Sequence, residues 1–460
     1  MNFANFVQRQ RAFFQSGATR PLDFRRAQLQ ALSAALVRHE SPLLAALQSD
    51  LNKSPLQAYA SELGLVQAEI RHAVRQLRRW SAAARRPTAW FSAPARSWIQ
   101  PEPYGVALLF GPWNYPAQLI LAPLVSAIAA GNCAVVKPSE LAPRTSEAVA
   151  ALIRETFPEE FVCAVEGGAE VAEALLTERF DKIFFTGSTR VGRSVMAAAA
   201  RHLTPVTLEL GGKCPTLVCA DAAVELAARR IVWGKFLNAG QTCVAPDFVL
   251  VDRAVSEPFI AALKKNIRRF YGDDARCSPD YGRIVNARHF TRLAGYLTDG
   301  RVEHGGAHDA AERFIAPTVL TKVDPSARVM QEEIFGPILP VLEFDGLEEA
   351  LELLRGRPTA LALYLFTRNH ATERRVLAEV PSGGACVNDT VSHMIGGALP
   401  FGGLGPSGMG ASHGRAGFEA FSHSRSVLRR ALWLDTPFRY PPQKLSLAVL
   451  KRAMGFLLSD

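Results

Sequence analysis

One of the seven cysteines lies in a polar turn. Cys243 ends the run NAGQTC, which begins at Asn238 between an expected helix and an expected strand. Most cysteines of a globular core are inert, small hydrophobic residues. A thiol in a glycine-bearing polar turn is instead a candidate nucleophile, although an inert cysteine remains the alternative.

A carboxylate stands where burial is costly. Glu209 follows Leu208 in the run LELGG, at the end of an apolar stretch and before two glycines. A charged side chain in that position costs free energy unless it is paired or has a function. A structural salt bridge and a general base would both explain Glu209.

A glycine-bearing segment follows another apolar stretch. The run FFTGSTRVG extends from Phe184 to Gly192 and precedes an alanine-rich helix. Glycines let the backbone turn tightly at a helix N-terminus, where free N–H groups and the helix dipole favour phosphate. The run does not match GxGxxG, so a turn without a ligand stays open as an explanation. Lys137 and Glu140, in the run KPSE at another strand end, could meet a ribose or lie in a solvated loop.

The elements that must position these residues alternate in type. From residue 103 onwards short apolar runs alternate with helical stretches, which is typical of a parallel sheet covered on both faces. Residues 1–80 are expected to be mostly helical, with breaks at Pro55 and Gly64, and the segment 81–101 is irregular and basic. Two α/β domains in series are the simplest account. The expected strands are 106–110, 134–136, 162–165, 182–185, 206–209, 215–218, 249–251, 339–344 and 385–388.

Length and composition exclude several classes of protein. The chain has 460 residues, which suits two or three domains, and its 48% hydrophobic and 21% charged residues are ordinary globular values. The net charge of +9 is spread along the chain, so no nucleic acid is expected as a partner. The cysteines form no CxxC pair, so no metal site or disulfide framework is expected and a reducing compartment is favoured. Glycines and prolines interrupt the uncharged run 103–136, so no membrane span is expected there.

The sequence resembles the aldehyde dehydrogenase superfamily, most closely its class 3 branch. The resemblance runs from about residue 5 to about residue 440 and rests on seven motifs in the family's order. It implies an aldehyde dehydrogenase-like α/β fold of two doubly wound domains plus a small bridging and oligomerisation element. The motifs are PWNYP from Pro112, KPSE from Lys137, FTGS from Phe185, LELGG from Leu208, GQTC from Gly240, EEIFGP from Glu332 and PFGG from Pro400.

The resemblance also implies domain boundaries. An NAD(P)-binding domain would cover 1–209, interrupted by a bridging segment at 82–101, and a catalytic domain would cover 210–410. The segment 411–440 would complete the bridging element. This element mediates dimerisation in the family, so a homodimer is expected.

The family's chemistry assigns roles to the candidate residues. Cys243 would attack the aldehyde carbonyl as a thiolate, because a tetrahedral centre is needed before hydride can leave. The oxyanion would accept hydrogen bonds from the side-chain amide of Asn114 and the backbone N–H of Cys243. After hydride transfer to the nicotinamide, Glu209 would activate the water that hydrolyses the thioester. Glu333 would hold the nicotinamide ribose and is the alternative base.

The cofactor that the resemblance implies is NAD, with NADP as the alternative. Lys137 and Glu140 would lie at the adenosine ribose, and Gly187 and Ser188 at the pyrophosphate. A carboxylate near the ribose favours a free 2′-hydroxyl. The positive charges of Lys137 and of Arg190, where the sequence departs from the family's pattern, could instead tolerate a 2′-phosphate.

Aromatic residues complete the implied site. Phe335 and Phe401 would pack around the nicotinamide end, and Tyr115 and Phe401 would line the substrate pocket. His413 and Asn388 also match the class 3 pattern and are expected to position the scaffold. The substrate would be an aromatic or a medium- or long-chain aliphatic aldehyde.

Three other functions compete with aldehyde oxidation. An acyltransferase or a phosphorylating semialdehyde dehydrogenase would keep the thioester but need no water-activating carboxylate, so Glu209 argues against both. A non-catalytic relative would keep only the fold. The presence of Cys243, Glu209 and Asn114 together argues against it.

The last residues, 441–460, combine leucines with Lys444, Lys451 and Arg452. Some class 3 relatives end in a hydrophobic membrane anchor, but the longest uncharged stretches here are six and seven residues. A span requires roughly 20 apolar residues. An amphipathic tail that packs on the dimer or covers the substrate entrance is therefore preferred, and weak peripheral membrane contact is the alternative. A cytoplasmic protein is expected.

Overall fold

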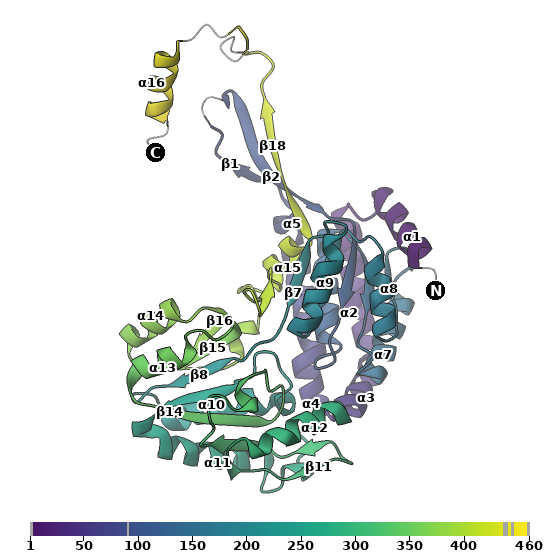
Figure 1. The fold of residues 1–460 in the computed structure, drawn as a ribbon. Helices are drawn as coiled ribbons and strands as arrows, with labels where there is room; N and C mark the ends of the chain where they lie inside the picture. Colours follow the sequence, from purple (N-terminus) through teal and green to yellow (C-terminus); the bar gives the residue numbers. More distant parts are fainter. Residues whose placement is uncertain (1–2, 90–91, 436–439, 443–445, 458–460) are drawn as a thin grey trace. The chain divides into compact units, whose positions relative to one another are not determined.

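The computed structural model describes residues 3–89, 92–435, 440–442 and 446–457 (Figure 1). Contacts between residues divide the chain into two compact units. The larger unit comprises Met1–Ser81 and Glu102–His423, and the smaller comprises Ala82–Pro101 and Ser424–Asp460. The larger unit contains two sheets of mostly parallel strands, each with its own apolar core.

The first sheet is built from buried apolar strands because helices cover it. Its strands run parallel except β17, which is antiparallel to its neighbour. The chain passes from β3 outward to β5 and then continues on the other side of β3 with β6 and β7. Ligands of such sheets bind at the carboxyl ends of the strands where the order reverses. The spatial order is β17 (Gly408–Met409), β7 (Val206–Glu209), β6 (Lys182–Thr186), β3 (Val106–Phe110), β4 (Cys133–Lys137) and β5 (Val162–Ala164).

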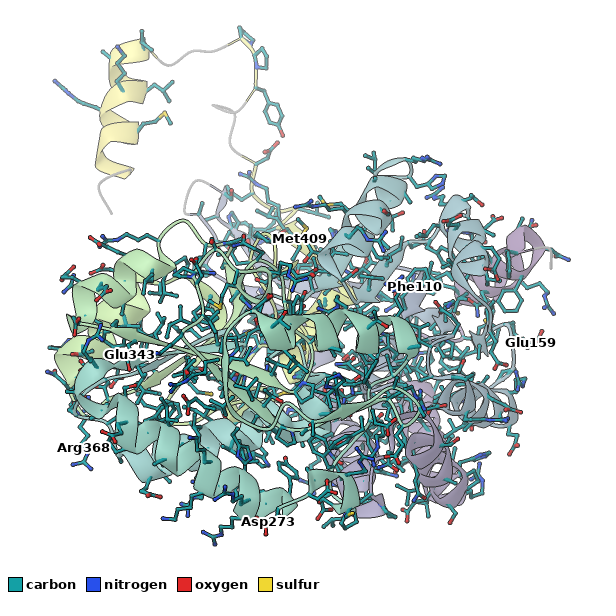
Figure 2. All side chains as sticks on the ribbon, turned by 60° about the horizontal axis from the view of Figure 1, so that its bottom comes forward. Phe110, Glu159, Asp273, Glu343, Arg368 and Met409 are labelled. Carbon is teal, nitrogen blue, oxygen red and sulfur yellow. The ribbon has the colours of Figure 1, made fainter. Side chains whose placement is uncertain are left out.

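Helices from both ends of the larger unit surround this sheet. α6 is buried on nearly every side, which explains its uniformly apolar sequence. Phe110 lies in the interior, whereas the charged side chains of Glu159, Asp273 and Arg368 lie at the periphery (Figure 2). The helices are α1 (Phe3–Gln15), α2 (Leu22–Arg38), α3 (Glu40–Leu51), α4 (Pro55–Ala58), α5 (Gly64–Ser81), α6 (Gln118–Ala130), α7 (Pro143–Thr156), α8 (Ala169–Thr177), α9 (Thr189–Ala200) and α15 (Gly414–Ala420).

Gly64 does not break the helix, contrary to the sequence prediction. A π-helical turn, η1 (Tyr59–Leu63), joins α4 to α5, and the N–H of Gly64 donates to the carbonyl oxygen of Tyr59. A Cβ at position 64 would lie 3.0 Å from that oxygen, so glycine permits the turn. Pro55 begins α4, where its missing N–H costs nothing.

The second sheet has seven strands, of which only β10 is antiparallel to its neighbour. In Figure 1, α13 and α14 cover one face of the sheet and α10 and α11 cover the other. The strand order is β10 (Arg301–His304), β13 (Thr318–Thr321), β14 (Ile338–Phe344), β9 (Phe248–Asp252), β8 (Pro215–Val218), β15 (Ala360–Phe366) and β16 (Ser382–Val387). The helices are α10 (Val224–Phe236), α11 (Ser256–Tyr271), α12 (Ala287–Gly295), α13 (Gly346–Leu354) and α14 (His370–Glu379), and β11 (His308–Asp309) pairs with β12 (Phe314–Ile315).

The smaller unit has a three-stranded sheet and a C-terminal helix. The sheet has the order β1 (Ala84–Arg86), β2 (Ala95–Pro103) and β18 (Ser422–Arg430). Residues 411–423 belong to the larger unit, unlike the expected bridging segment that starts at 411, because Phe418 and Phe421 are buried in its core. The tail forms α16 (Leu447–Leu457), and Lys444 lies outside the described residues. Among the residues described, no helix is long and apolar enough to cross a membrane.

Candidate active site

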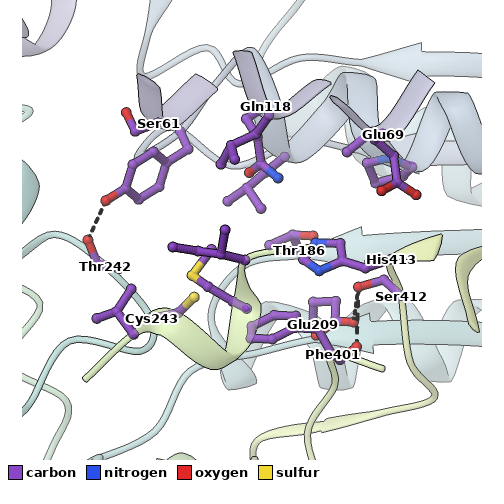
Figure 3. A pocket seen from close by; sticks show the side chains of 18 of the residues that line it. Ser61, Glu69, Gln118, Thr186, Glu209, Thr242, Cys243, Phe401, Ser412 and His413 are labelled. Carbon is purple, nitrogen blue, oxygen red and sulfur yellow. Dashed lines mark hydrogen bonds between the residues drawn. The ribbon is translucent and has the colours of Figure 1, made fainter. Parts of the chain in front are cut away.

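A cavity of about 440 Å³ lies in the larger unit and is lined by residues of both sheets (Figure 3). Cys243, Glu209, Tyr115 and Phe401 line it, as the sequence predicted for a common site. Asn114 is not among the lining residues. The polar or ionisable members of the lining are Gln57, Ser61, Glu69, Tyr115, Gln118, Ser126, Thr186, Glu209, Thr242, Cys243, Asp280, Ser412 and His413.

A strained turn presents Cys243 to this cavity. After α10 the backbone passes through Asn238 and Ala239, which have positive φ angles of 53° and 51°. Each such residue costs of order 1–3 kcal/mol and persists only where the surroundings hold it. The side-chain amide of Gln241 does so by donating to the carbonyl oxygens of Asn238 (3.0 Å) and Arg283 (2.9 Å).

The thiol of Cys243 is a weak acid in this setting. Burial and the nearby carboxylates of Glu333 and Glu209 raise its pKa to about 12. A thiol with so high a pKa is protonated at neutral pH. A positive charge placed beside the sulfur would lower the pKa and favour the thiolate.

Glu209 ends β7 with its carboxylate in the same cavity. The side chain is 5% exposed, and burial raises its pKa to about 8. Ser412 Oγ donates to Glu209 Oε1 over 2.9 Å (Figure 3), while Oε2 has no hydrogen-bond partner. No salt bridge is found for Glu209 among the described residues, so the structural explanation for its burial is not supported. A carboxyl group with a pKa near neutrality and a free oxygen suits a general base.

Asn114 lies in the loop between β3 and α6 and faces the cysteine turn. Its Nδ2 donates to the carbonyl oxygen of Gln241 over 3.0 Å, and the side chain is 3% exposed. A side-chain amide carries two N–H groups, so one remains for another acceptor. The next residue, Tyr115, forms a 2.7 Å hydrogen bond with Thr242, beside Cys243. The loop and the turn are thus joined at two successive positions.

Glu333 approaches the glycines that follow β7. A Cβ at Gly211 would lie 2.1 Å from Glu333 Oε2, so only glycine permits this contact. Burial is the main cause that raises the pKa of Glu333 to about 8, with the carboxylate of Asp247 adding to it. Glu333 Oε1 is buried without a partner. This oxygen can accept a hydrogen bond from a hydroxyl group of a ligand.

Lys137 and Glu140 form an ion pair at the carboxyl end of β4. Lys137 Nζ lies 2.6 Å from Glu140 Oε2, and Lys137 is 4% exposed. The pair brings a cation and a carboxylate to the strand end, as the sequence suggested. Its charges balance, so it does not by itself select NAD over NADP.

Gly187 and Ser188 connect β6 to α9. A Cβ at Gly187 would lie 2.6 Å from the ring of Phe185, and Ser188 Oγ caps α9 by accepting the N–H of Val191 (3.4 Å). The free N–H groups of the first helical turn therefore face the carboxyl edge of the sheet. An anionic group is favoured there by these donors and by the helix dipole.

Of the two predicted phenylalanines, Phe401 lines the cavity and Phe335 does not. Phe335 has a positive φ of 50° and packs edge-on against Trp113, with ring centroids 5.1 Å apart. Phe401 stacks on His413 at 5.2 Å, and both line the cavity. Asn388 lies elsewhere, where its side chain bonds the backbone of Thr367.

The residues present fit a nicotinamide dinucleotide. Two buried oxygens, Glu333 Oε1 and Thr186 Oγ1, have no partner and could bond to hydroxyl or amide groups. Gly187 and the start of α9 offer a site for a pyrophosphate. Within the described part of the chain, no group of three or more His, Cys, Asp or Glu side chains is placed to hold a metal ion.

Several residues of the site were not predicted from the sequence. Ser412 bonds Glu209 across 203 positions of the chain, and Thr242 bonds Tyr115 across 127. The sequence signals were that Thr242 stands inside the GQTC motif and that Ser412 stands beside the family-matching His413. Lys53 and Glu62, which contact the Asn114 loop, carried no signal at all.

Comparison with known proteins identifies the family. The model described as the aldehyde dehydrogenase family matches residues 2–427. The chain belongs to this family. A relative from Canis lupus familiaris, the dimeric NADP-preferring aldehyde dehydrogenase, is 46% identical over 97% of this chain and 98% of its own length. Aldehyde dehydrogenase family 3 member A2 of Rattus norvegicus is 46% identical over 96% of this chain and 91% of its own.

Solved structures agree with this assignment. The substrate-bound state of Staphylococcus aureus AldH has a TM-score of 0.96 and 43% identity, covering 99% of this chain and 100% of that one. The NAD+ complex of an aldehyde dehydrogenase from Bacillus cereus has a TM-score of 0.83 and 28% identity, covering 92% and 88%. The predicted fold and the class 3 resemblance are confirmed. The aldehyde dehydrogenase is an oxidoreductase that oxidises aldehydes with NAD or NADP.

Proposed function

We propose that this aldehyde dehydrogenase forms a thioester between Cys243 and its substrate and hydrolyses it with water activated by Glu209. The observation that carries the proposal is the placement of a thiol and an unpaired carboxyl oxygen in one cavity. A cavity with a thiol but no carboxyl group would be sufficient for acyl transfer. The added carboxyl group supplies the base that hydrolysis needs.

The chain's own residues support each step. Cys243 Sγ gives up its proton to solvent and attacks the aldehyde carbon as a thiolate. The carbonyl oxygen becomes an oxyanion that accepts hydrogen bonds from the free N–H of Asn114 and the backbone N–H of Cys243. Oxidised nicotinamide, when bound, would supply a positive charge that favours the thiolate and would accept the hydride that the former aldehyde carbon loses. The oxyanion then collapses to the carbonyl group of the Cys243 thioester. Glu209 then takes a proton from water as the water attacks the thioester carbon. Carboxylic acid leaves and the thiol is restored.

The residues that would hold the cofactor lie at or after the ends of β4 and β6 of the first sheet, or in the segment before β14 of the second. Glu333 would accept a hydrogen bond from a hydroxyl group of the nicotinamide ribose, and Phe335 would pack beside the nicotinamide ring. Gly187 and Ser188 would receive the pyrophosphate. Lys137 and Glu140 would meet the adenosine ribose.

The lining of the cavity favours an uncharged apolar substrate. Most of its residues are aliphatic or aromatic, and its charged members are Glu69, Glu209 and Asp280. No lysine or arginine appears among the described lining residues. We therefore assign medium- or long-chain aliphatic and aromatic aldehydes as the substrate class.

For straight-chain aldehydes we expect kcat/KM to rise with length until the cavity is filled. Each buried methylene contributes about 0.8 kcal/mol, which corresponds to about fourfold in kcat/KM. An aldehyde of matched length with a terminal carboxylate should be at least about tenfold poorer in kcat/KM, since the described lining offers no lysine or arginine to pair with the carboxylate. Initial rates of NADH formation across the two series provide the test. Equal kcat/KM for the neutral and carboxylated partners would contradict the assignment.

We propose a cytoplasmic homodimer whose tail does not bind membranes. The seven cysteines are all free, which suits a reducing compartment. One relative is named dimeric. Sedimentation velocity should give about twice the chain mass of 50.0 kDa.

We expect that the intact protein does not sediment with anionic liposomes, even at low salt. Removing residues 441–460 should therefore not change the sedimentation. The tail helix carries Lys451 and Arg452, so low salt is the condition that most favours binding. Co-sedimentation of both forms at low and high salt is the measurement. Binding by the full chain that disappears on truncation and at high salt would show a peripheral membrane contact instead.

A further inference from the structure

A buried ion pair lies behind the loop that carries Asn114. Lys53 Nζ is 2.5 Å from Glu62 Oε1, and both side chains have 0% exposure. Neither residue lines the cavity of about 440 Å³. Burying two charges costs several kcal/mol per ion, and excellent geometry with further hydrogen bonds is needed to offset it. The other groups that bond to Lys53 and Glu62 therefore indicate which part of the structure the ion pair holds in place.

Lys53 uses all its donors on the pair and the loop. Besides Glu62, the ammonium group donates to the carbonyl oxygen of Asn114 over 2.9 Å. It also lies 4.0 Å from the centroid of the Tyr115 ring. An ammonium group has three N–H donors, and these three contacts account for them. Lys53 thus fixes two successive residues of the loop.

Glu62 holds the other end of the same loop. Its Oε2 accepts from the N–H groups of Ala117 (2.8 Å) and Gln118 (3.2 Å). These groups belong to the first turn of α6, whose N-cap, Ala117, has no side chain that could cap the helix. A carboxylate at this position satisfies free donors and interacts favourably with the helix dipole.

The helix that carries Glu62 is irregular at this residue. Glu62 lies in the π-helical turn Tyr59–Leu63, between regular α-helical segments. Such turns insert one residue and are frequent at functional sites. The position of Glu62 therefore depends on a local departure from α-helical hydrogen bonding, which Gly64 permits.

We propose that Lys53 and Glu62 are positioning residues that hold Asn114 for stabilisation of the oxyanion. The inference rests on the proposed role of Asn114. The Asn114 carbonyl oxygen accepts from both Lys53 and Asn238 Nδ2 (2.8 Å), so the backbone is fixed from two sides. The side-chain amide is then aimed at the cysteine turn, where Nδ2 reaches Gln241 O. A displacement of about 1 Å in such a group can cost about 100-fold in rate.

Three variants test the positioning role. Glu62→Gln removes the charge, and Lys53→Met with Glu62→Gln removes both charges while keeping similar volume, which protects the fold. Asp50→Asn is the matched control, because Asp50 is also buried and accepts the N–H groups of Arg144 (3.3 Å) and Thr145 (2.8 Å) at the start of α7. We expect the first two variants to lose about 10- to 100-fold in the first-turnover rate with KM within about twofold. Asp50→Asn should lower Tm with a first-turnover rate within about twofold of the parent.

Two further measurements separate positioning from general damage. Alkylation of Cys243 by iodoacetamide forms no oxyanion, so its rate should stay within about twofold in all three variants. In an Asn114→Ala background, Glu62→Gln should cause no further loss of the first-turnover rate. Independent, multiplying losses would overturn the inference, as would a parent-like rate in the charge-free double variant. If Asn114→Ala itself leaves the rate unchanged, the proposed oxyanion role fails, and the inference fails with it.

Discussion

Cys243→Ser should lower the rate of aldehyde oxidation by at least about 1000-fold, because a hydroxyl group ionises far less readily than a thiol and is a weaker nucleophile. The side chains are similar in size, so the fold and cofactor binding should persist. NADH formation measures the rate, and fluorescence titration with NADH measures cofactor binding. A serine variant that retains more than a few per cent of the parent rate would show that Cys243 is not the nucleophile.

Cys219→Ser is the matched control for this substitution. Cys219 has the same intermediate exposure as Cys243, and burial likewise raises the pKa of its thiol to about 12. It does not line the cavity. Its serine variant should oxidise aldehydes within about twofold of the parent rate, because position in the cavity rather than thiol acidity distinguishes the two residues.

Glu209→Gln should slow steady-state turnover by about 100-fold or more while sparing the first turnover. A general base contributes about 100- to 10,000-fold, and here it acts on water after the cofactor has been reduced. Rapid mixing should show a burst of one NADH per active site followed by a slow phase. Loss of the burst with intact cofactor binding would place Glu209 earlier in the reaction. Unchanged turnover would move the base role to Glu333, and Glu333→Gln tests that directly.

The raised pKa of Glu209 sets the direction of the pH dependence. Only the ionised carboxylate can accept a proton, and burial raises the pKa from its ordinary value of 4.5 to about 8. The rate of the slow, hydrolytic phase should therefore increase from about pH 7 to about pH 9 and level off at higher pH. This increase should be absent in Glu209→Gln.

Motif residues could be predicted from the sequence because each lies at a strand end or in a short turn. Glu209 and Lys137 end apolar strands and Gly187 follows one, and the carboxyl ends of parallel strands meet at one edge of a sheet. β15, with the sequence ALALYLF, was not predicted even though it is fully buried within the second sheet. A short apolar run of this kind does not show by periodicity whether it is strand or helix.

Contacts between distant segments could not be predicted. Lys53 reaches Asn114 across 61 positions, and Ser412 reaches Glu209 across 203. Such pairs depend on how the helices pack on the sheet, which no local pattern encodes. The prediction of a helix break at Gly64 was wrong for a similar reason. Glycine in a helical stretch suggests a break, and the π-helical turn that Gly64 permits could not be predicted from the sequence.

The mass of the enzyme during turnover tests the thioester most directly. Glu209→Gln, mixed with aldehyde and NAD and quenched in acid at the end of the burst, should carry one acyl group per chain. Peptide mapping should place that group on the peptide containing Cys243, and hydroxylamine should release it. An unmodified chain after a full burst, or an acyl group on another residue, would contradict the account.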